Sequence, residues 1–333
     1  MSKRLEIKTE HIGAIRYLFE LLKDVFEDVN IECIRDDEMN KKPDTEKLLE
    51  DGDDGAGKKK KKKEKEQVED DDKKDTADKE KKSGGMKIMA MDKTQTLLVN
   101  VKLIAKKFDV FKVKRKVFDI GINLGQLSKA LKTLKTDDSL TISVNEDDKD
   151  WLMLKFRNDK KRCDSYDKIK LLDINKSKFE IPPTAFDAVV IINTEDFHTI
   201  CKDMSNIQSV MEIKCTRKSL TFTSTGDSSE KGKTYYPDEN GIKINFNKDS
   251  KIDVVQGIFE LKFLIMFTNK SQNLCPRLQL FMKNDYPLVV KFAVATLGKL
   301  QFCVSPHDED RIAKDFDDDE EYYNEDKLEY LDE

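Results

Sequence analysis

Apolar residues recur at helical spacing in four short segments of the chain. Spacings of three and four residues place side chains on one side of an α-helix, so each segment is expected to form a short amphipathic helix. Thr194 is expected to cap the third helix, with Glu195 and Asp196 in its first turn. The four stripes are Ile12, Ile15, Leu18, Phe19 and Leu22; Leu124, Leu127, Leu131 and Leu134; Phe197, Ile200 and Met204; and the residues from Leu261 to Asn269.

Most of the remaining chain alternates apolar with polar residues, which is the period of a half-buried β-strand. Many strands combined with few helices indicate an α+β fold, in which antiparallel sheets carry the helices on one face. The predicted strands include Leu97 to Leu103, Leu140 to Val144, Ser219 to Thr225, Ile242 to Phe246, Arg277 to Met282, Pro287 to Val294 and Lys299 to Pro306.

The pattern repeats along the chain once residues 36–83 are set aside. The helical segment that begins at Glu10 is echoed by the one that begins at Glu195, and Leu124 is echoed by Leu261, both at an offset of 137 residues. We therefore predict two similar halves, roughly residues 1–165 and 182–306, each with antiparallel sheets and two short helices.

Two segments are too polar to belong to either half. Residues 36–83 hold 18 acidic and 15 basic side chains, including six consecutive lysines from Lys58 to Lys63. Such a segment buries too little apolar surface to offset the entropy of ordering, so we expect a disordered insertion that expands a hairpin loop. The lysine run is either a nuclear-import signal or a solvated polyampholyte. Residues 307–333 form an acidic tail with 14 acidic and 3 basic residues.

The globular body is basic although the whole chain has a net charge of −5. The remaining 258 residues carry 43 basic and 34 acidic side chains, a balance that favours a polyanionic partner. Cations lie on the polar sides of all four predicted helices. A lysine-bearing helix face is often merely solvated, but its recurrence in both halves indicates a shared target. Lysine suits backbone phosphates, so sequence-independent binding of duplex DNA fits best.

Signatures of catalysis are missing from the sequence. It contains no glycine-rich nucleotide loop, no H-E-x-x-H and no G-x-S-x-G, so we expect no catalytic residue, no metal site and no cofactor. His198 is interpreted as a solvated histidine on a helix surface. The six cysteines have no C-x-x-C spacing and are expected to be reduced thiols. No apolar run approaches the length of a membrane span or a secretory signal, so a soluble, intracellular protein is expected.

Several long stretches resemble the proliferating cell nuclear antigen family of eukaryotic sliding clamps. The strongest are IKLLDINKSKFEIPPTAFDAVV from Ile169, FHTICKDMSNIQSVMEIKC from Phe197 and YPLVVKFAVATLGKLQFCVSP from Tyr286. INLGQLSKALK from Ile122 and MAMDKTQTLLV from Met89 support them. The resemblance covers the 258-residue body and fails in the insertion and the tail.

The resemblance implies a ring of three identical subunits whose helices line a central hole and whose sheets form the outer shell. Such a ring encircles duplex DNA, gives a DNA polymerase processivity, recruits replication and repair proteins, and is opened by an ATP-dependent clamp loader. It implies a location in the nucleus or a viral replication compartment, with no membrane partner. By position, the residues expected to face DNA phosphates are Arg16, Lys23, Lys129, Lys132, Lys202 and Lys262.

The resemblance also implies a domain layout and a hydrophobic pocket. The layout is an N-terminal clamp domain (1–168, containing the insertion 36–83), an interdomain connector (169–187), a C-terminal clamp domain (188–306) and the tail (307–333). The pocket takes peptides of the form Q-x-x-aliphatic-x-x-aromatic-aromatic from polymerases, ligases and nucleases. Its residues map onto Met91, Phe179, Ile181, Pro287 and Cys303.

Three positions depart from the family pattern. Cys303 stands where a pocket-lining tyrosine is usual, and Arg217 replaces the lysine that is ubiquitinated in the cellular protein, although Lys218 is adjacent. Lys176 and Lys178 give the connector a basic character that favours different partner peptides. Together with the insertion, these differences suggest a divergent member, as from a large DNA virus or a protist.

Two other functions remain open on the sequence. One is a subunit of a heterotrimeric checkpoint-type clamp, which shares the fold but assembles with different chains. The other is a monomeric or dimeric viral processivity factor that holds DNA by charge without encircling it.

The acidic tail is expected to compete with DNA for the basic surface, because its net charge is −11. Deleting residues 307–333 should then raise the affinity for duplex DNA several-fold at low salt, as measured by fluorescence anisotropy. An unchanged affinity would reject this role for the tail.

Overall fold

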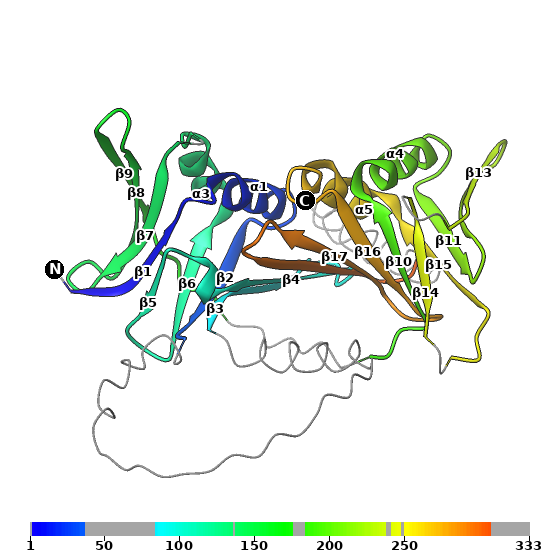
Figure 1. Ribbon diagram of the computed structural model, residues 1–333, viewed down its shortest axis with the longest axis horizontal. Coiled ribbons are helices and arrows are strands. Elements are labelled where there is room, and N and C mark those ends of the chain that lie inside the picture. Colours follow the sequence, from blue (N-terminus) through cyan, green and yellow to red (C-terminus); the bar gives the residue numbers. More distant parts are fainter. Residues whose placement is uncertain are drawn as a thin grey trace, which may run out of the picture.

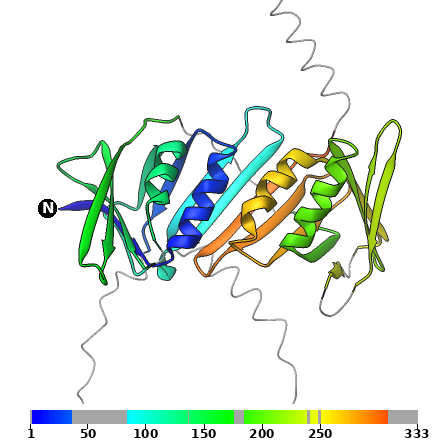
Figure 2. The same ribbon diagram turned by 90° about the horizontal axis from the view of Figure 1, so that it is seen from above.

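The described part of the chain is built from four α-helices that lie side by side above antiparallel sheets (Figures 1 and 2). The computed structural model describes residues 2–36, 84–135, 137–175, 184–237, 241–247 and 250–307. The helices are α1 (Ile12–Lys23), α3 (Leu124–Lys132), α4 (Thr194–Ser205) and α5 (Leu261–Ser271), and a single 3₁₀ turn, η1, covers Ala105–Lys107. All four helices lie where the apolar spacing predicts them.

The strands before residue 171 belong to the first half of the chain. They are β1 (Lys3–Thr9), β2 (Asp28–Ile34), β3 (Gly85–Met91), β4 (Leu97–Ile104), β5 (Val110–Val113), β6 (Val117–Asn123), β7 (Ser139–Asn145), β8 (Trp151–Asn158) and β9 (Cys163–Lys170). Strands β2 and β3 pair antiparallel with Ile34 opposite Gly85, which confirms that the charged insertion interrupts a hairpin. The residues of the insertion from 37 to 83 lie outside the described part of the chain.

The second half repeats the order of strands and helices of the first. Its strands are β10 (Ala188–Asn193), β11 (Val210–Thr216), β12 (Leu220–Thr225), β13 (Glu230–Tyr235), β14 (Lys243–Phe246), β15 (Val254–Glu260), β16 (Arg277–Met282), β17 (Leu288–Val294) and β18 (Gly298–Val304). In each half a helix follows the first strand and a second helix follows the sixth. The prediction of an α+β fold with two similar halves is therefore confirmed.

The repeat offset is correct for one pair of helices and wrong by three residues for the other. Leu124 and Leu261 are both first residues of their helices, which agrees with the predicted spacing. Helix α1 begins at Ile12, two residues after Glu10, so the alignment of Glu10 with Glu195 predicts that α4 begins two residues after Glu195. Helix α4 in fact begins three residues earlier, at Thr194. A slip of three residues keeps the apolar stripe on nearly the same side of a helix, so the sequence pattern alone could not detect it.

All strands pair antiparallel and form three sheets. The orders are β5-β1-β7-β8-β9, β13-β12-β11-β15 and, in the central sheet, β14-β10-β16-β17-β18-β4-β3-β2-β6. The central sheet is shared by the two halves because β18 pairs with β4, from Gly298 opposite Leu103 to Val304 opposite Leu97. Strands β9 and β13 are edge strands, and Figure 1 places them near opposite ends of the molecule.

The core lies between the helices and the sheets. The buried apolar side chains form one continuous cluster that includes both halves. At the junction, the ring of Phe302 on β18 stacks on the ring of Phe267 on α5, with their centroids 4.3 Å apart. The ring centroid of Phe292 on β17 lies 5.6 Å from that of Phe302. Burial of such aromatic rings stabilises the fold by about 1.5–3 kcal/mol for each side chain.

Helix α4 begins differently from the prediction, because Asn193 and not Thr194 is its N-cap. The Asn193 side chain accepts a hydrogen bond of 2.9 Å from the amide of Glu195. Strand β10 runs directly into the helix, so its last residue supplies the extended conformation that a cap requires. The Thr194 hydroxyl is buried and donates instead to the Cys275 carbonyl at 2.9 Å.

Candidate nucleic-acid and partner-peptide sites

The six cations predicted to face DNA all lie on the four helices. Their apolar sides pack toward the sheets, so the polar sides form one surface of the molecule (Figure 2). Contacts join the helices in the order α3, α1, α5, α4. This helix surface carries Arg16 and Lys23 on α1, Lys129 and Lys132 on α3, Lys202 on α4 and Lys262 on α5.

The six cations differ in their exposure and in whether a carboxylate lies beside them. Lys129, Lys132 and Lys202 are exposed. Lys262 is also exposed, but its ammonium lies 2.9 Å from Glu260 and 4.7 Å from the ring centroid of Phe263. Arg16 and Lys23 are half-buried, with Nε of Arg16 3.4 Å from Glu20 and Nζ of Lys23 4.0 Å from Asp24. Helix α3 therefore presents the least neutralised positive charge.

A seventh cation on these helices joins the two halves. Lys270, in the last turn of α5, lies 2.5 Å from the carboxylate of Asp24 and donates to the carbonyl of Glu20 at 3.2 Å. Both partners belong to the C-terminal end of α1, so the contact fixes α5 against α1. Lys270 could not be identified from the sequence, because only the packing of α1 on α5 reveals its partners.

The prediction that His198 is a solvated surface residue is wrong. His198 is buried between α4 and α5, with 7% of its surface exposed, and its Nδ1 lies 2.8 Å from Oγ1 of Thr268. The Thr268 hydroxyl donates its only proton to the Leu264 carbonyl at 2.6 Å, which assigns the donated proton to Nδ1 of His198. Burial, together with the nearby Lys202 ammonium, lowers the pKa of His198 below its ordinary value of 6.5.

The predicted pocket residues that the structure describes lie on the face of the central sheet opposite the helices. Met91 is paired with Leu98, Leu98 with Cys303, and Cys303 with Val289, across strands β3, β4, β18 and β17. We call these four residues the apolar row. Side chains directly opposite one another on an antiparallel sheet point to the same face, so the row is continuous.

Three of the five predicted pocket residues lie in or beside this row, and the other two lie outside the described residues. Pro287 precedes β17, two residues before Val289. Phe179 and Ile181 lie outside the described residues, as do Lys176 and Lys178. Cys303 is half-buried, and this burial raises the pKa of its thiol. Cys303 therefore acts as a small apolar side chain at the position where the family resemblance implies an aromatic ring.

Two family models together match residues 67–307. Residues 67–179 match the proliferating cell nuclear antigen N-terminal domain, and residues 180–307 match the C-terminal domain. A proliferating cell nuclear antigen from Dictyostelium discoideum is 31% identical over 225 residues, which are 67% of this chain and 86% of that protein. The chain belongs to the proliferating cell nuclear antigen family.

Two further proteins are similar to this chain. The proliferating cell nuclear antigen of Caenorhabditis elegans is 29% identical over 226 residues, covering 68% of this chain and 85% of that protein. The "Probable DNA polymerase sliding clamp" of Acanthamoeba polyphaga mimivirus is 28% identical over 310 residues, or 92% of this chain. The chain spans only 63% of the length of that viral protein.

A crystal structure agrees with the fold. The structure of the proliferating cell nuclear antigen from Entamoeba histolytica matches with a TM-score of 0.69 at 23% identity, covering 92% of this chain and all of that chain. The antiparallel sheets and the two helices in each half are therefore those of the family.

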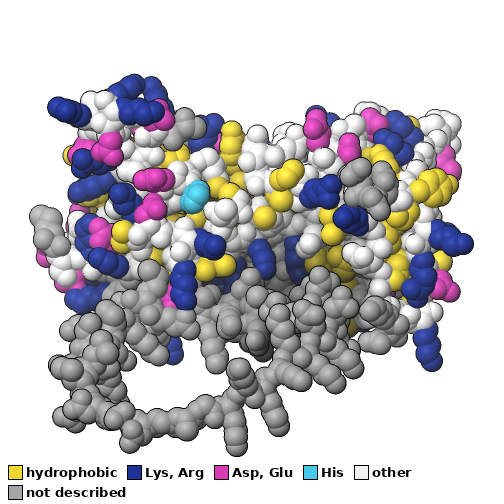
Figure 3. Space-filling model, viewed as in Figure 1, with side chains coloured by type: hydrophobic (Ala, Val, Ile, Leu, Met, Phe, Trp, Pro, Cys, Tyr) yellow, Lys and Arg dark blue, Asp and Glu magenta, His cyan; other side chains and the backbone are white. Residues whose placement is uncertain are grey.

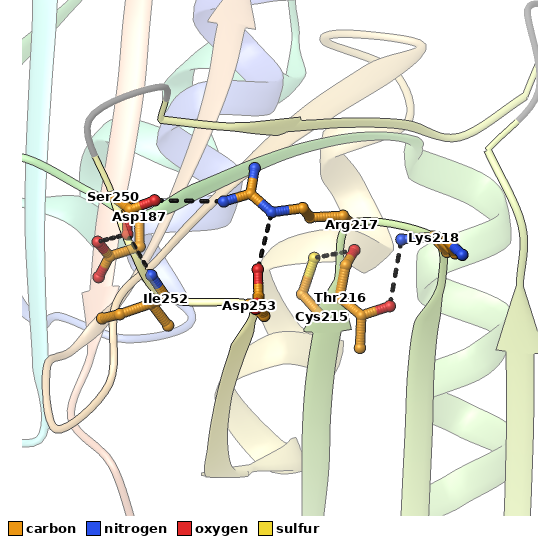
Figure 4. Close-up of polar contacts among 8 residues, drawn as sticks. All are labelled: Asp187, Cys215, Thr216, Arg217, Lys218, Ser250, Ile252 and Asp253. Carbon is orange, nitrogen blue, oxygen red and sulfur yellow. Dashed lines mark hydrogen bonds and ion pairs between the residues drawn. The ribbon is translucent and has the colours of Figure 1, made fainter.

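Arg217, which departs from the family pattern, has a structural role (Figure 4). It lies in the turn between β11 and β12, and its guanidinium donates to Asp253 at 3.0 Å and to the Ser250 carbonyl at 3.2 Å. The same guanidinium lies 5.0 Å from the ring centroid of Phe246. Arg217 thus ties this turn to the segment that leads into β15. Both Arg217 and the neighbouring Lys218 are exposed.

The described residues contain no cluster of His, Cys, Asp and Glu that could hold a metal ion. Within the same ranges, no helix is both long and apolar enough to cross a membrane.

The stability of the fold should depend on pH through His198. Because the folded pKa is lowered, the unfolded chain binds a proton first as the pH falls below about 6.5, and this favours unfolding. The free energy of unfolding, measured by urea denaturation, should therefore fall from neutral pH until the pH is below the folded pKa.

His198→Gln, which cannot titrate, should give a shallower decline over the same range. Thr268→Val should lower the stability at neutral pH by about 1 kcal/mol, because it leaves the ring nitrogen unpaired. A slope in His198→Gln equal to that of the wild type would contradict this role for His198.

Proposed function

We propose that the chain is a DNA sliding clamp: a homotrimeric ring that encircles duplex DNA, gives a DNA polymerase processivity and recruits replication and repair proteins. The ring would be opened by an ATP-dependent loader and would work in the nucleus or in a viral replication compartment. Its DNA would lie against the helix surface, held by Arg16, Lys23, Lys129, Lys132, Lys202 and Lys262. The protein would have no catalytic residue of its own.

The observation that best supports this proposal is that two strands left at sheet edges correspond to the two strands that pair where the halves meet. Within the chain, the ninth strand of the second half, β18, pairs with the fourth strand of the first half, β4. The corresponding strands of the opposite halves are β9 and β13, and both are edge strands of their sheets. Edge strands offer unpaired amide and carbonyl groups to another chain. Pairing of β9 with β13 of a second copy would therefore repeat the junction already present inside the molecule.

The side chains of these edges support the same pairing. Tyr166 on β9 is 66% exposed, and Tyr236, next to the end of β13, is 72% exposed. Large exposed aromatic side chains are typical of interfaces. A head-to-tail contact between different edges of identical subunits closes a ring when the rotation permits. Membership of the family supports three as the number of subunits.

The helix surface supports an encircling rather than a gripping mode of binding. Its cations are lysines and one arginine on four separate helices, which suit contacts to phosphates without reading a base sequence. A threaded ring stays on DNA by topology, so each contact can be weak and still allow movement.

The outer face supports recruitment of partners. Three residues of the apolar row, Met91, Leu98 and Cys303, would form a surface with Pro287 for the apolar residues of partner peptides, whereas Val289 is buried beside them. Phe179 and Ile181 of the connector would complete this surface. Cys303 in place of an aromatic residue would leave a wider site than is usual in the family.

Tyr166→Ala should break the ring. Removing the exposed aromatic ring from β9 should lower the solution mass from three chains toward the 38.6 kDa of one chain, measured by analytical ultracentrifugation at micromolar concentration. Val117→Ala, at an exposed position on the edge strand β6, is the matched control and should leave the mass unchanged. A wild-type protein with the mass of one chain would overturn the homotrimer and favour a subunit of a heteromeric clamp.

Charge reversal on α3 should weaken DNA binding. The double variant Lys129→Glu, Lys132→Glu should lower the affinity for duplex DNA several-fold at low salt, and should reduce the slope of log affinity against log salt by at least about one unit. Lys218→Glu, outside the helices, is the control. An unchanged slope in the double variant would exclude the helix surface as the DNA site. Wild-type protein held equally well on linear and circular DNA at raised salt would instead favour a factor that does not encircle DNA.

A further inference from the structure

The edge strands β9 and β13 both carry charged side chains of both signs. Figure 3 shows Lys and Arg side chains beside Asp and Glu side chains at both ends of the molecule, where Figure 1 places these strands. Strand β9 has the sequence CDSYDKIK and strand β13 the sequence EKGKTY. If the two edges pair, the register of the pairing decides which of these charges meet.

The repeat inside the chain shows which residue of β18 corresponds to each residue of β9. The successive cross-strand partners on β1, β7, β8 and β9 are Ile7, Ile142, Leu154 and Asp167. Those on β10, β16, β17 and β18 are Val190, Leu280, Val290 and Phe302. The first three residues of each row are buried, and Asp167 and Phe302 are both the fifth residues of their strands. Asp167 therefore corresponds to Phe302.

The same reasoning aligns β13 with β4. The successive cross-strand partners on β6, β2, β3 and β4 are Ile120, Ile31, Ile88 and Val101. Those on β15, β11, β12 and β13 are Gly257, Ile213, Phe222 and Lys233. The first residue of each row lies four residues before the helix that follows, α3 or α5. Lys233 therefore corresponds to Val101, and Lys231 corresponds to Val99.

The pairing of β18 with β4 inside the chain then gives the register between copies. Phe302 is paired with Val99, and both strands run antiparallel. The corresponding residues of β9 and β13 would meet in the same way if the two edges repeat this junction. The pairs, with the β9 residue first and the β13 residue of the next copy second, are Asp167 with Lys231, Lys168 with Glu230, and Tyr166 with Gly232.

In this register an acidic side chain meets a lysine at two adjacent positions. Opposite charges directly across an antiparallel ladder stabilise it, and adjacent residues of a strand point to opposite faces, so each face gains one ion pair. A shift of two residues in either direction loses one or both pairs. One shift places Lys168 opposite Gly232, and the other places it opposite Ser228. Charge complementarity therefore favours the register that the repeat predicts.

Both lysines already have a carboxylate beside them in their own chain. The Lys168 ammonium donates to Asp148 at 2.8 Å, and the Lys231 ammonium lies 3.6 Å from Asp203. All four side chains are partly exposed. Because an ammonium has three donors, a carboxylate of the next copy would bind beside the carboxylate already present and would not have to replace it.

We propose that β9 and β13 of neighbouring copies pair in this register, and that the two ion pairs make these edges select a second copy of this chain. The inference rests on the proposed function, because it names the contacts that would close the ring. The exposed ring of Tyr166 has room over Gly232, since the heavy atoms nearest to the place of a Cβ there are 4.0 Å away.

Charge reversal in the full chain tests the pair of Lys168 with Glu230. Lys168→Glu and Glu230→Lys each put like charges at every junction, whereas the double variant restores opposite charges. Each ring holds three junctions, so weakening each about fivefold should raise the midpoint concentration of the monomer–trimer equilibrium about tenfold. Sedimentation equilibrium at low salt should show this shift for both single variants and a midpoint within about twofold of the wild type for the double variant.

Lys218→Glu is the control, because Lys218 is an exposed lysine in the turn between β11 and β12 and belongs to neither edge. It should leave the midpoint unchanged. High salt should shrink the shift of the single variants, which a general loss of structure would not do. Melting temperatures measured in parallel would show whether each variant is folded.

Mixing the wild type with the double variant tests selection. Every junction between these two chains would hold two like charges, although each chain alone forms matched junctions. After mixing at a concentration where rings exchange subunits, tagged wild type should capture about tenfold less untagged double variant than untagged wild type.

Each other outcome overturns a different statement. A wild type with the mass of one chain would overturn the homotrimer of the proposed function, and this inference with it. If the wild type is a trimer and neither single variant shifts its midpoint, the ion pairs are wrong while the ring stands. Single variants that are weakened but not restored in the double variant would show that Lys168 does not face Glu230, so the register is wrong. Equal capture of the double variant and the wild type would overturn the selection.

Discussion

The antiparallel ladder between β18 and β4 joins the last strand of the second half to the fourth strand of the first, from Gly298 opposite Leu103 to Val304 opposite Leu97. This ladder makes one nine-stranded sheet out of two repeats. On one side of the sheet it brings α5 against α1, where Lys270 reaches Asp24. On the other side it places Cys303 opposite Leu98, so the apolar row is continuous only because this ladder has this register.

The same ladder shows which strands could join one copy of the chain to the next in a ring. The chain already contains one edge-to-edge contact, between β18 and β4. The corresponding strands, β9 and β13, lie at the edges of their sheets, so two copies of the chain could form the same contact between them. The helices then lie on one side of every junction and the partner face on the other. In the proposed ring, phosphate contacts on the helix side would carry no sequence information, whereas specificity for partners would reside on the outer face, where strand register fixes the positions of the side chains.

Much of this fold is predictable from the sequence, because helices and strands differ in the period of their apolar positions. Leu124 and Leu261 illustrate this, since each begins a helix and follows a strand in its own half. The predictions of the N-cap and of the exposure of His198 were wrong because tertiary contacts determine both. Asn193 replaces Thr194 as the cap because β10 enters the helix without a loop, and His198 is buried because α5 supplies Thr268 as its partner. The apolar row could not be foreseen as a whole, since Leu98 and Cys303 become neighbours only through the pairing of β4 with β18, which are distant in sequence.

In the proposed ring, the edges β9 and β13 join identical chains around a hole lined by the four helices. Negative-stain electron microscopy of the purified full-length chain tests it most directly. Class averages should show a closed annulus with three-fold symmetry and a stain-filled centre. Single arcs, or compact particles without a hole, would contradict it.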